Sequence, residues 1–153
     1  MSHSHLIPMD DQHPALGIDH GAARIGLAIT DPVGIMAHPL ETVHIKQTEP
    51  LERINQLIAQ RQVKQIIIGL PYRMDGSEGT AAEKIREFTD ELRDSLAAPL
   101  PIHFIDERLT TVSAAAKLHA AGKNSKKQKN LIDQAAAVEI LSDWLTQQAP
   151  PLF

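Results

Sequence analysis

Short apolar runs separated by turn residues occupy the first third of the chain. Residues 15–19 and 24–30 are aliphatic and small, and a third run of this kind lies within 36–45. Gly21 and the Asp-Pro-Val-Gly sequence at 31–34 stand between them, and such residues favour tight turns between strands. The pattern therefore predicts a meander of three antiparallel strands.

The rest of the chain alternates between helical and strand patterns. Residues 66–70 are apolar and mostly β-branched, which is typical of a central parallel strand. Thr80 and Glu83 have the spacing of a capping box, which predicts a helix that opens there. The elements expected after the meander are, in chain order, a helix over 49–60, a strand over 66–70, the helix from Thr80, a strand over 102–105, and helices over 111–121 and 130–147.

This order of elements predicts an α/β fold with a five-stranded mixed sheet and helices on both faces. Crossover connections make the strands at 66–70 and 102–105 parallel to the first strand, and sheets of this kind carry their sites at the carboxyl ends of parallel strands. With 153 residues, the chain has room for one domain. We expect that domain to span 15–147, between a loosely attached tail at 1–14 and a C-terminal tail at 148–153.

The composition is that of a globular protein of a reducing compartment. Apolar residues make up 42% of the chain and charged residues 22%, and without cysteine the chain forms no disulfide and no thiolate metal site. The first residues lack the basic and apolar segments of a secretion signal, and no apolar run approaches membrane-spanning length. These features predict a cytoplasmic protein with no membrane partner.

The distribution of charge points to a polyanionic partner more than the total charge does. The formal net charge of −4 by itself argues against nucleic acid, but the interval from Arg108 to Lys129 contains no aspartate or glutamate. The lysines inside it are Lys117, Lys123, Lys126 and Lys127. Such a stretch forms either a phosphate-binding edge or a solvated helix end, and charge alone favours neither.

Three acidic residues adjoin apolar segments that lie far apart in the sequence. Asp19 ends the first strand, Glu107 follows the strand at 102–105, and Asp133 precedes a run of alanines in the last helix. A buried ionised carboxylate needs a partner or a metal ion. The two strand ends lie at one edge of the predicted sheet, and alanines let the helix approach it. The three carboxylates are therefore candidate catalytic groups and metal ligands.

Each carboxylate also has a purely structural interpretation. Asp19 could start a turn, as aspartate often does. Glu107 or its neighbour Asp106 could pair with a loop arginine, and strand alternation, which sends the two acids to opposite faces, does not tell which one faces Asp19. Asp133 in the first turn of a helix capped by Asn130 would gain roughly 0.3–1 kcal/mol from the helix dipole.

A divalent metal ion would reconcile three carboxylates at one place. At about 4 Å, each pair repels by about 4 kcal/mol with an effective dielectric constant near 20. Mg²⁺ and Mn²⁺ are hard cations that prefer oxygen ligands, and they remove this repulsion. Two such ions activate a water and stabilise the leaving oxygen in phosphodiester hydrolysis, so the constellation predicts a metal-dependent nuclease. Arg24 is a candidate for phosphate contact, because its guanidinium matches phosphate geometry.

A series of short motifs runs in order along the chain. The motifs are Gly-Ile-Asp-His-Gly at 17–21, Arg-Ile-Gly at 24–26, Asp-Pro at 31–32, Gly-Leu-Pro at 69–71, Met-Asp-Gly at 74–76, Asp-Glu-Arg-Leu-Thr-Thr at 106–111 and Ile-Asp-Gln-Ala-Ala at 132–136. Together they resemble the YqgF (RuvX) family of bacterial proteins, which have an RNase H-like fold. The resemblance covers about residues 15–147 and agrees with the predicted order of elements.

The resemblance implies a nuclease that matures the 5′ end of precursor 16S ribosomal RNA. By position, it makes Asp19, Glu107 and Asp133 the metal ligands, and it places the family's recurrent arginines at Arg24 and Arg108. Phosphate contact by these arginines is our own interpretation. We extend it to the lysines of the basic interval nearest the last helix, Lys123, Lys126 and Lys127.

Three other functions stay open on the sequence. Holliday-junction resolution, an older proposal for the family, needs symmetric cleavage and hence a homodimer, for which the sequence shows no clear interface. A nucleic-acid-binding module without catalysis has the same fold, although the intact carboxylates argue against it. An actin-like or sugar kinase needs two such domains around ATP, and this chain has length for one. The resemblance favours a structured RNA precursor over a four-way DNA junction as substrate.

Overall fold

The computed structural model describes residues 12–107 and 126–148. The elements in chain order are β1 Ala15–His20, β2 Arg24–Thr30, β3 Ala37–His44, α1 Pro50–Arg61, β4 Gln65–Leu70, α2 Thr80–Ser95, β5 Ile102–Asp106 and α4 Lys126–Gln148. The helix predicted over 111–121 lies outside the described residues, as do residues 1–11 and 149–153. Within the described ranges, no helix is both long and apolar enough to span a membrane.

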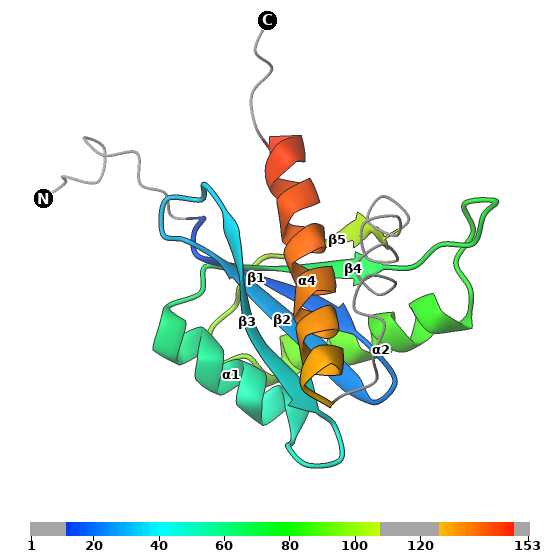
Figure 1. The fold of residues 1–153 in the computed structure, drawn as a ribbon, viewed down its shortest axis with the longest axis horizontal. Coiled ribbons are helices and arrows are strands. Elements are labelled where there is room, and N and C mark those ends of the chain that lie inside the picture. The colour runs from blue at the N-terminus through cyan, green and yellow to red at the C-terminus, as the bar shows by residue number, and fades with distance from the viewer. Residues whose placement is uncertain (1–11, 108–125, 149–153) are drawn as a thin grey trace, which may run out of the picture.

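The strands form one mixed sheet in the order β3-β2-β1-β4-β5 (Figure 1). β1 pairs antiparallel with β2, and β2 antiparallel with β3, which confirms the predicted meander. β4 lies parallel to β1 on one side and to β5 on the other, as the two crossover connections require. The carboxyl ends of β1, β4 and β5 therefore lie at one edge of the sheet.

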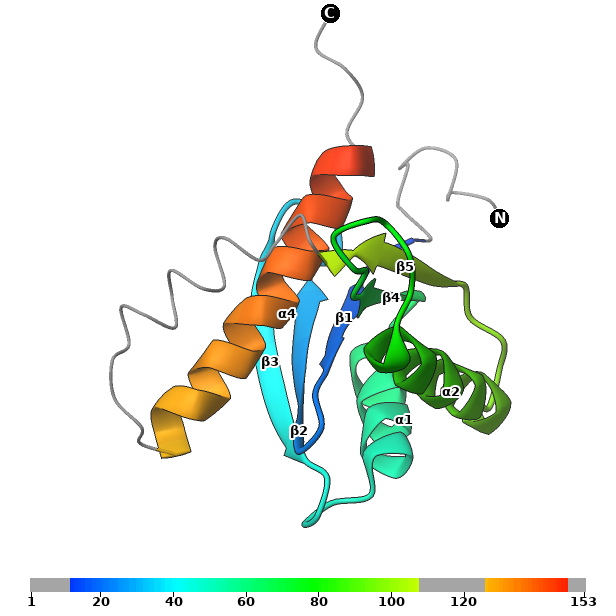
Figure 2. The same ribbon diagram turned by 90° about the vertical axis from the view of Figure 1, so that its right-hand side faces the viewer.

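The helices cover both faces of the sheet, which confirms the predicted architecture. Figure 2 shows α1 and α2 side by side on one face and α4 across the other. β4 is fully buried because it lies between the two layers, and this explains why its residues 66–70 are a continuous apolar run. The core under α1 and α2 is aliphatic, whereas the core under α4 contains several alanines.

Two predicted helix starts are wrong in detail. Thr80 is the first helical residue of α2, and the cap is Gly79, which makes no side-chain capping bond. The capping box therefore does not form, because the threonine lies one position inside the helix. The last helix begins at Lys126 and not near Asn130, so Asp133 does not lie in a first turn. The lysine and glutamine residues before Asn130 are good helix formers and extend the helix backwards.

The segment just before β1 is bonded to the sheet. His13 Nδ1 lies 2.8 Å from the hydroxyl of Thr30, and the side-chain amide of Gln65 donates to the carbonyl of Gln12 at 2.9 Å. The backbone amide of Lys64 donates to the carbonyl of Pro14 at 2.8 Å. Residues 12–14, which the sequence analysis placed in the tail, thus contact β2 and β4.

Candidate active site

On the sheet face under α4, glycines occupy positions near the ends of the central strands. Gly26 of β2 is the direct antiparallel partner of Asp19 on β1. A Cβ atom at Gly26 would overlap the backbone carbonyl oxygen of Asp133 on α4. Only glycine permits this close approach, and it brings the helix backbone at Asp133 next to the strand position opposite Asp19.

A second glycine makes room for the other strand-end carboxylate. A Cβ atom at Gly69 of β4 would lie 2.6 Å from Cδ1 of Ile140 on α4 and 2.8 Å from Oε1 of Glu107. Gly69 pairs with Ile105, which is buried against α4, and Glu107 follows Ile105 by two residues. The sequence left open which of the two acids faces Asp19. The structure shows that Glu107, and not Asp106, lies on the α4 face of the sheet together with Asp19.

Asp19 and Glu107 form a carboxylate pair joined by a side-chain hydrogen bond. One of two hydrogen-bonded carboxyls must hold the proton, so the pair shares it. Burial raises the pKa of Asp19, and it raises the pKa of Glu107 to about 8, with further contributions from the hydrogen bond to Asp19 and from the charges of Asp19 and Asp106. At neutral pH the pair therefore keeps a proton that two exposed carboxylates would have lost.

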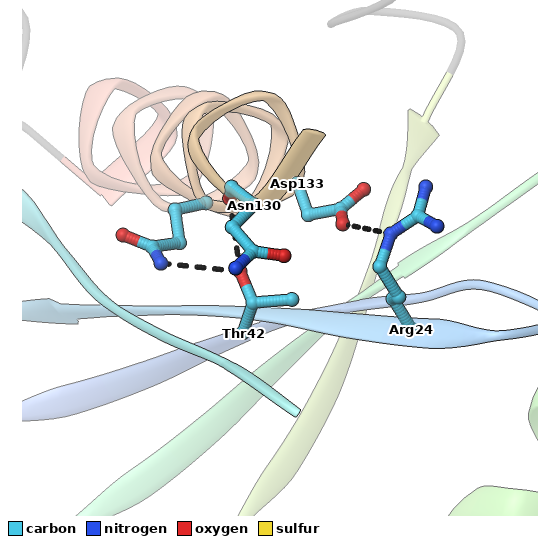
Figure 3. A network of polar contacts seen from close by, with 5 residues as sticks. Arg24, Thr42, Asn130 and Asp133 are labelled. Atoms are coloured by element: carbon cyan, nitrogen blue, oxygen red, sulfur yellow. Dashed lines mark hydrogen bonds and ion pairs between the residues drawn. The ribbon is translucent and has the colours of Figure 1, made fainter. Parts of the chain in front are cut away.

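Asp133 lies beside this pair, but its side chain is bonded elsewhere. Its charge raises the pKa of Asp19, while its Oδ2 accepts a hydrogen bond from Nε of Arg24 at 2.6 Å (Figure 3). Within residues 12–107 and 126–148, no group of three or more acidic, histidine or cysteine side chains is arranged to hold a metal ion. The structure thus brings two of the three predicted ligands together and leaves the third in an ion pair with Arg24.

Thr42 of β3 fixes α4 over the site, and the sequence analysis missed it. Thr42 is the antiparallel partner of Gly26, so it continues the row from Asp19 across the sheet. Its hydroxyl donates to the backbone carbonyl of Asn130 at 2.9 Å and accepts from the side-chain amide of Gln134 at 3.1 Å (Figure 3). These residues flank Asp133 in sequence, so the threonine anchors the helical turn that carries it. A threonine in a strand is ordinary, and no sequence signal distinguishes this one.

A pocket of about 480 Å³ opens next to Glu107 on the α2 side of the site. The β1–β2 turn and the first turns of α2 contribute to its walls, and its polar side chains are those of His20, Thr80, Lys84 and Glu107. The ring of His20 lies 4.5 Å from the ring of Phe88, and burial lowers the pKa of this histidine. His20 and Lys84 are the basic side chains in the pocket wall.

The other predicted phosphate-binding residues are only partly described. Arg108 and Lys123 lie outside the described residues. Lys126 and Lys127 form the first turn of α4, but the structure does not describe their side chains. Of the predicted phosphate ligands, Arg24 is thus the one whose side-chain position is known, and it lies within hydrogen-bonding distance of Asp133.

The donor set fits a divalent cation. Two half-buried carboxyls that share a proton become two ionised ligands when a cation replaces that proton, and carboxylate oxygens suit Mg²⁺ and Mn²⁺. Asp133 lies close enough to act electrostatically on Asp19, and its backbone is fixed against Gly26. Asp19 and Glu107 would hold the ion first, and Asp133 would complete the set.

Comparison with known proteins finds one matching family and several relatives with the same name. A family model described as RuvX, Holliday junction resolvase, matches residues 13–147. A Streptomyces coelicolor protein with the name "Putative pre-16S rRNA nuclease" is 46% identical over 134 residues, which are 87% of this chain and 80% of that protein. A Cutibacterium acnes protein of the same name is 43% identical over 132 residues, covering 86% of this chain and 81% of that protein.

A solved structure shares the fold at much lower identity. The T. thermophilus RuvC chain in complex with a Holliday junction substrate aligns with a TM-score of 0.54 at 18% identity, covering 88% of this chain and 95% of that one. At this identity the likeness shows the fold alone. It confirms the RNase H-like architecture predicted for the five-stranded sheet.

Proposed function

The chain belongs to the RuvX family, and from that premise we propose that it is a divalent-metal-dependent nuclease that processes the 5′ end of pre-16S rRNA. Close relatives carry the name of such a nuclease, and the fold is that of RuvC. The substrate would be a structured RNA precursor in the cytoplasm. We propose residues 15–147 as the catalytic unit, between the two terminal tails.

The observation that carries this proposal is the proton-sharing pair of Asp19 and Glu107 at the strand ends. We propose that these two carboxylates and Asp133 are the catalytic residues and hold Mg²⁺ or Mn²⁺, as two ions. When bound, the ions supply an activated water and stabilise the leaving oxygen of the phosphodiester. Asp19 and Glu107 must give up their shared proton for this.

Basic side chains around the pair would position the RNA backbone. Arg24 lies beside Asp133 and offers a guanidinium to the phosphate next to the carboxylates. Lys84 and Thr80 line the pocket beside Glu107, where they would contact the backbone of a neighbouring nucleotide. The remaining proposed phosphate ligands are Arg108, Lys123, Lys126 and Lys127.

The direct test is cleavage of a 5′-extended 16S precursor by the purified protein with Mg²⁺ or Mn²⁺. We expect Asp19→Asn to lower the rate by on the order of 10³-fold, because metal stabilisation of the reacting charge is worth several kcal/mol. Asp94→Asn is the matched control, since Asp94 is an exposed acid on α2 away from the sheet. Equal rates for wild type and Asp19→Asn would refute the proposal.

A second candidate function is the resolution of four-way DNA junctions. The description of the matching family model and the fold of the junction-bound RuvC favour it. A resolvase cuts two strands symmetrically, so this function predicts a homodimer on the junction. Cleavage of a synthetic four-way junction, with the mass of the complex measured in parallel, separates the two candidates. Binding of RNA or junction without cleavage of either would favour a non-catalytic module.

A further inference from the structure

We infer that Arg24 couples phosphate binding to completion of the metal site, by holding Asp133 until a phosphate takes its place. The inference rests on the proposed function, because it concerns the same carboxylates. In the structure the Asp133 carboxylate is bonded to Arg24. A phosphate that captures the guanidinium would release the carboxylate, and the released carboxylate would become a ligand. Metal and substrate would then bind cooperatively.

The ion pair has a geometry that a phosphate can displace. Asp133 engages Arg24 through one donor, Nε, at 2.6 Å. Among the residues that the structure describes, the four remaining N–H donors of this guanidinium have no protein acceptor. Figure 3 shows its terminal nitrogens turned away from α4. A phosphate that binds side-on takes Nε together with one terminal nitrogen, and these two parallel hydrogen bonds are stronger together than the single bond of Nε to Asp133, which they replace.

The pair is also accessible to a strand of nucleic acid. The side chains of Arg24 and Asp133 are 33% and 19% exposed, so neither is sealed in the core. Arg24 is the first residue of β2, directly after the turn whose Gly21 and Ala22 line the pocket beside Glu107. A nucleic-acid backbone that passes the Asp19–Glu107 pair along this pocket would therefore also reach Arg24.

Only the side chain of Asp133 has to move for the exchange. The helix backbone at Asp133 lies against Gly26, the strand partner of Asp19. Thr42 holds the same turn through the carbonyl of Asn130 and the amide of Gln134. With the backbone fixed on both counts, rotation of the Asp133 side chain is the remaining route from Arg24 to the neighbouring carboxylates.

Charge explains why Asp133 pairs with Arg24. Asp133 already acts electrostatically on Asp19, and a third carboxylate turned toward the pair would add repulsion. Arg24 neutralises Asp133 at a distance from the pair. Once a cation is bound to Asp19 and Glu107, it attracts the Asp133 carboxylate. The ion pair with Arg24 is then what keeps Asp133 away from the cation. Because linkage is reciprocal, metal would raise the affinity for phosphate by the same factor.

The test measures Mn²⁺ binding by electron paramagnetic resonance, with and without a short 2′-O-methyl RNA strand that resists cleavage. We expect the RNA to tighten Mn²⁺ binding to the wild type by about tenfold, within the usual range of coupling between sites. Arg24→Gln should bind Mn²⁺ tightly without RNA and gain little on its addition. Arg24→Lys, which keeps the charge but lacks Nε, should fall between the two.

Arg53→Gln is the matched control. Arg53 on α1 pairs with Glu41 on β3 at 2.7 Å, with exposures of 27% and 31%. The substitution removes an ion pair of comparable exposure that involves α1, on the sheet face opposite α4 (Figure 2). Its Mn²⁺ binding should follow the wild type with and without RNA. Thermal unfolding of each variant checks that it is folded.

The outcomes separate the inference from the proposed function. If Mn²⁺ binding depends on Asp19 but the RNA tightens it equally in wild type and Arg24→Gln, the coupling through Arg24 is refuted and the metal site stands. Weaker Mn²⁺ binding by Arg24→Gln without RNA would also refute it. If Asp19→Asn binds Mn²⁺ as tightly as wild type, the proposed metal site itself fails.

Discussion

The two faces of the sheet are built for different tasks. Under α1 and α2 the strands present large aliphatic side chains that fill a conventional core. Under α4 they present glycine and alanine near the strand ends, and the helix backbone comes into contact with the sheet (Figure 2). The difference teaches that the carboxylate site depends on missing side chains: the space that Gly26 and Gly69 leave free is what brings Asp133 and Glu107 close to Asp19.

The largest effect is expected from filling that space. Gly26→Ala places a methyl group where the carbonyl oxygen of Asp133 lies, so α4 must shift away from β2. A displacement of about 1 Å costs on the order of 10²-fold in rate when it misplaces catalytic groups. We expect this loss in kcat for RNA cleavage, together with weaker Mn²⁺ binding. A variant with unchanged kcat would show that the close approach of α4 is not needed for the site.

The opposite face supplies the contrasting variant. Leu92 of α2 is fully buried in the aliphatic core. Leu92→Ala should lower the free energy of unfolding by about 2–5 kcal/mol, as large-to-small core substitutions do. Measured by chemical denaturation, this loss should come with nearly unchanged kcat at a temperature where the protein is folded. If kcat fell as far as in Gly26→Ala, the two faces would not be functionally separate.

A smaller effect concerns the pH dependence of stability without metal. Folding raises the pKa of Glu107 from its ordinary value of 4.5 to about 8, so between these values the folded protein holds a proton that the unfolded chain has released. The contribution of Glu107 to the free energy of unfolding is therefore largest below pH 4.5, and it decreases as the pH rises toward 8. The raised pKa of Asp19 acts in the same direction.

Thermal or denaturant unfolding from pH 5 to 9 tests this dependence, with Glu107→Gln as the comparison. The glutamine side chain at position 107 cannot ionise, so the stability of this variant should vary less with pH than that of the wild type. Saturating Mg²⁺ should stabilise the wild type most at the alkaline end, where the carboxylates are ionised. Parallel pH profiles for the two proteins would contradict the raised pKa of Glu107.

Much of the fold could be predicted because each element carries its own local pattern. The alternating runs and turn residues define the meander, and the continuous apolar stretch of β4 identifies a strand covered on both faces. That an acid at the end of β5 would lie near Asp19 followed from their positions at strand ends, whereas the choice of Glu107 over Asp106 came from the family resemblance. In contrast, the helix starts depended on the conformation of single residues: Gly79 takes the cap beside Thr80, and α4 extends back through its lysines.

The contacts across the site could not be predicted, because they depend on register. Thr42 lies under α4 only because β3 pairs with β2 so that Thr42 faces Gly26. The ion pair of Arg24 with Asp133 joins residues 109 positions apart and requires the exact placement of α4. Glycines inside strand patterns, as at Gly26 and Gly69, are the sequence signal that could have indicated the close approach.

The most direct test of the account is the number of protons released when Mn²⁺ binds. Isothermal titration calorimetry at pH 7 in two buffers with different ionisation enthalpies gives this number. Because Asp19 and Glu107 share a proton that a cation must displace, we predict the release of about one proton per protein, abolished in Glu107→Gln. Mn²⁺ binding without proton release, or equal release in both proteins, would contradict the claim that this pair is the metal site.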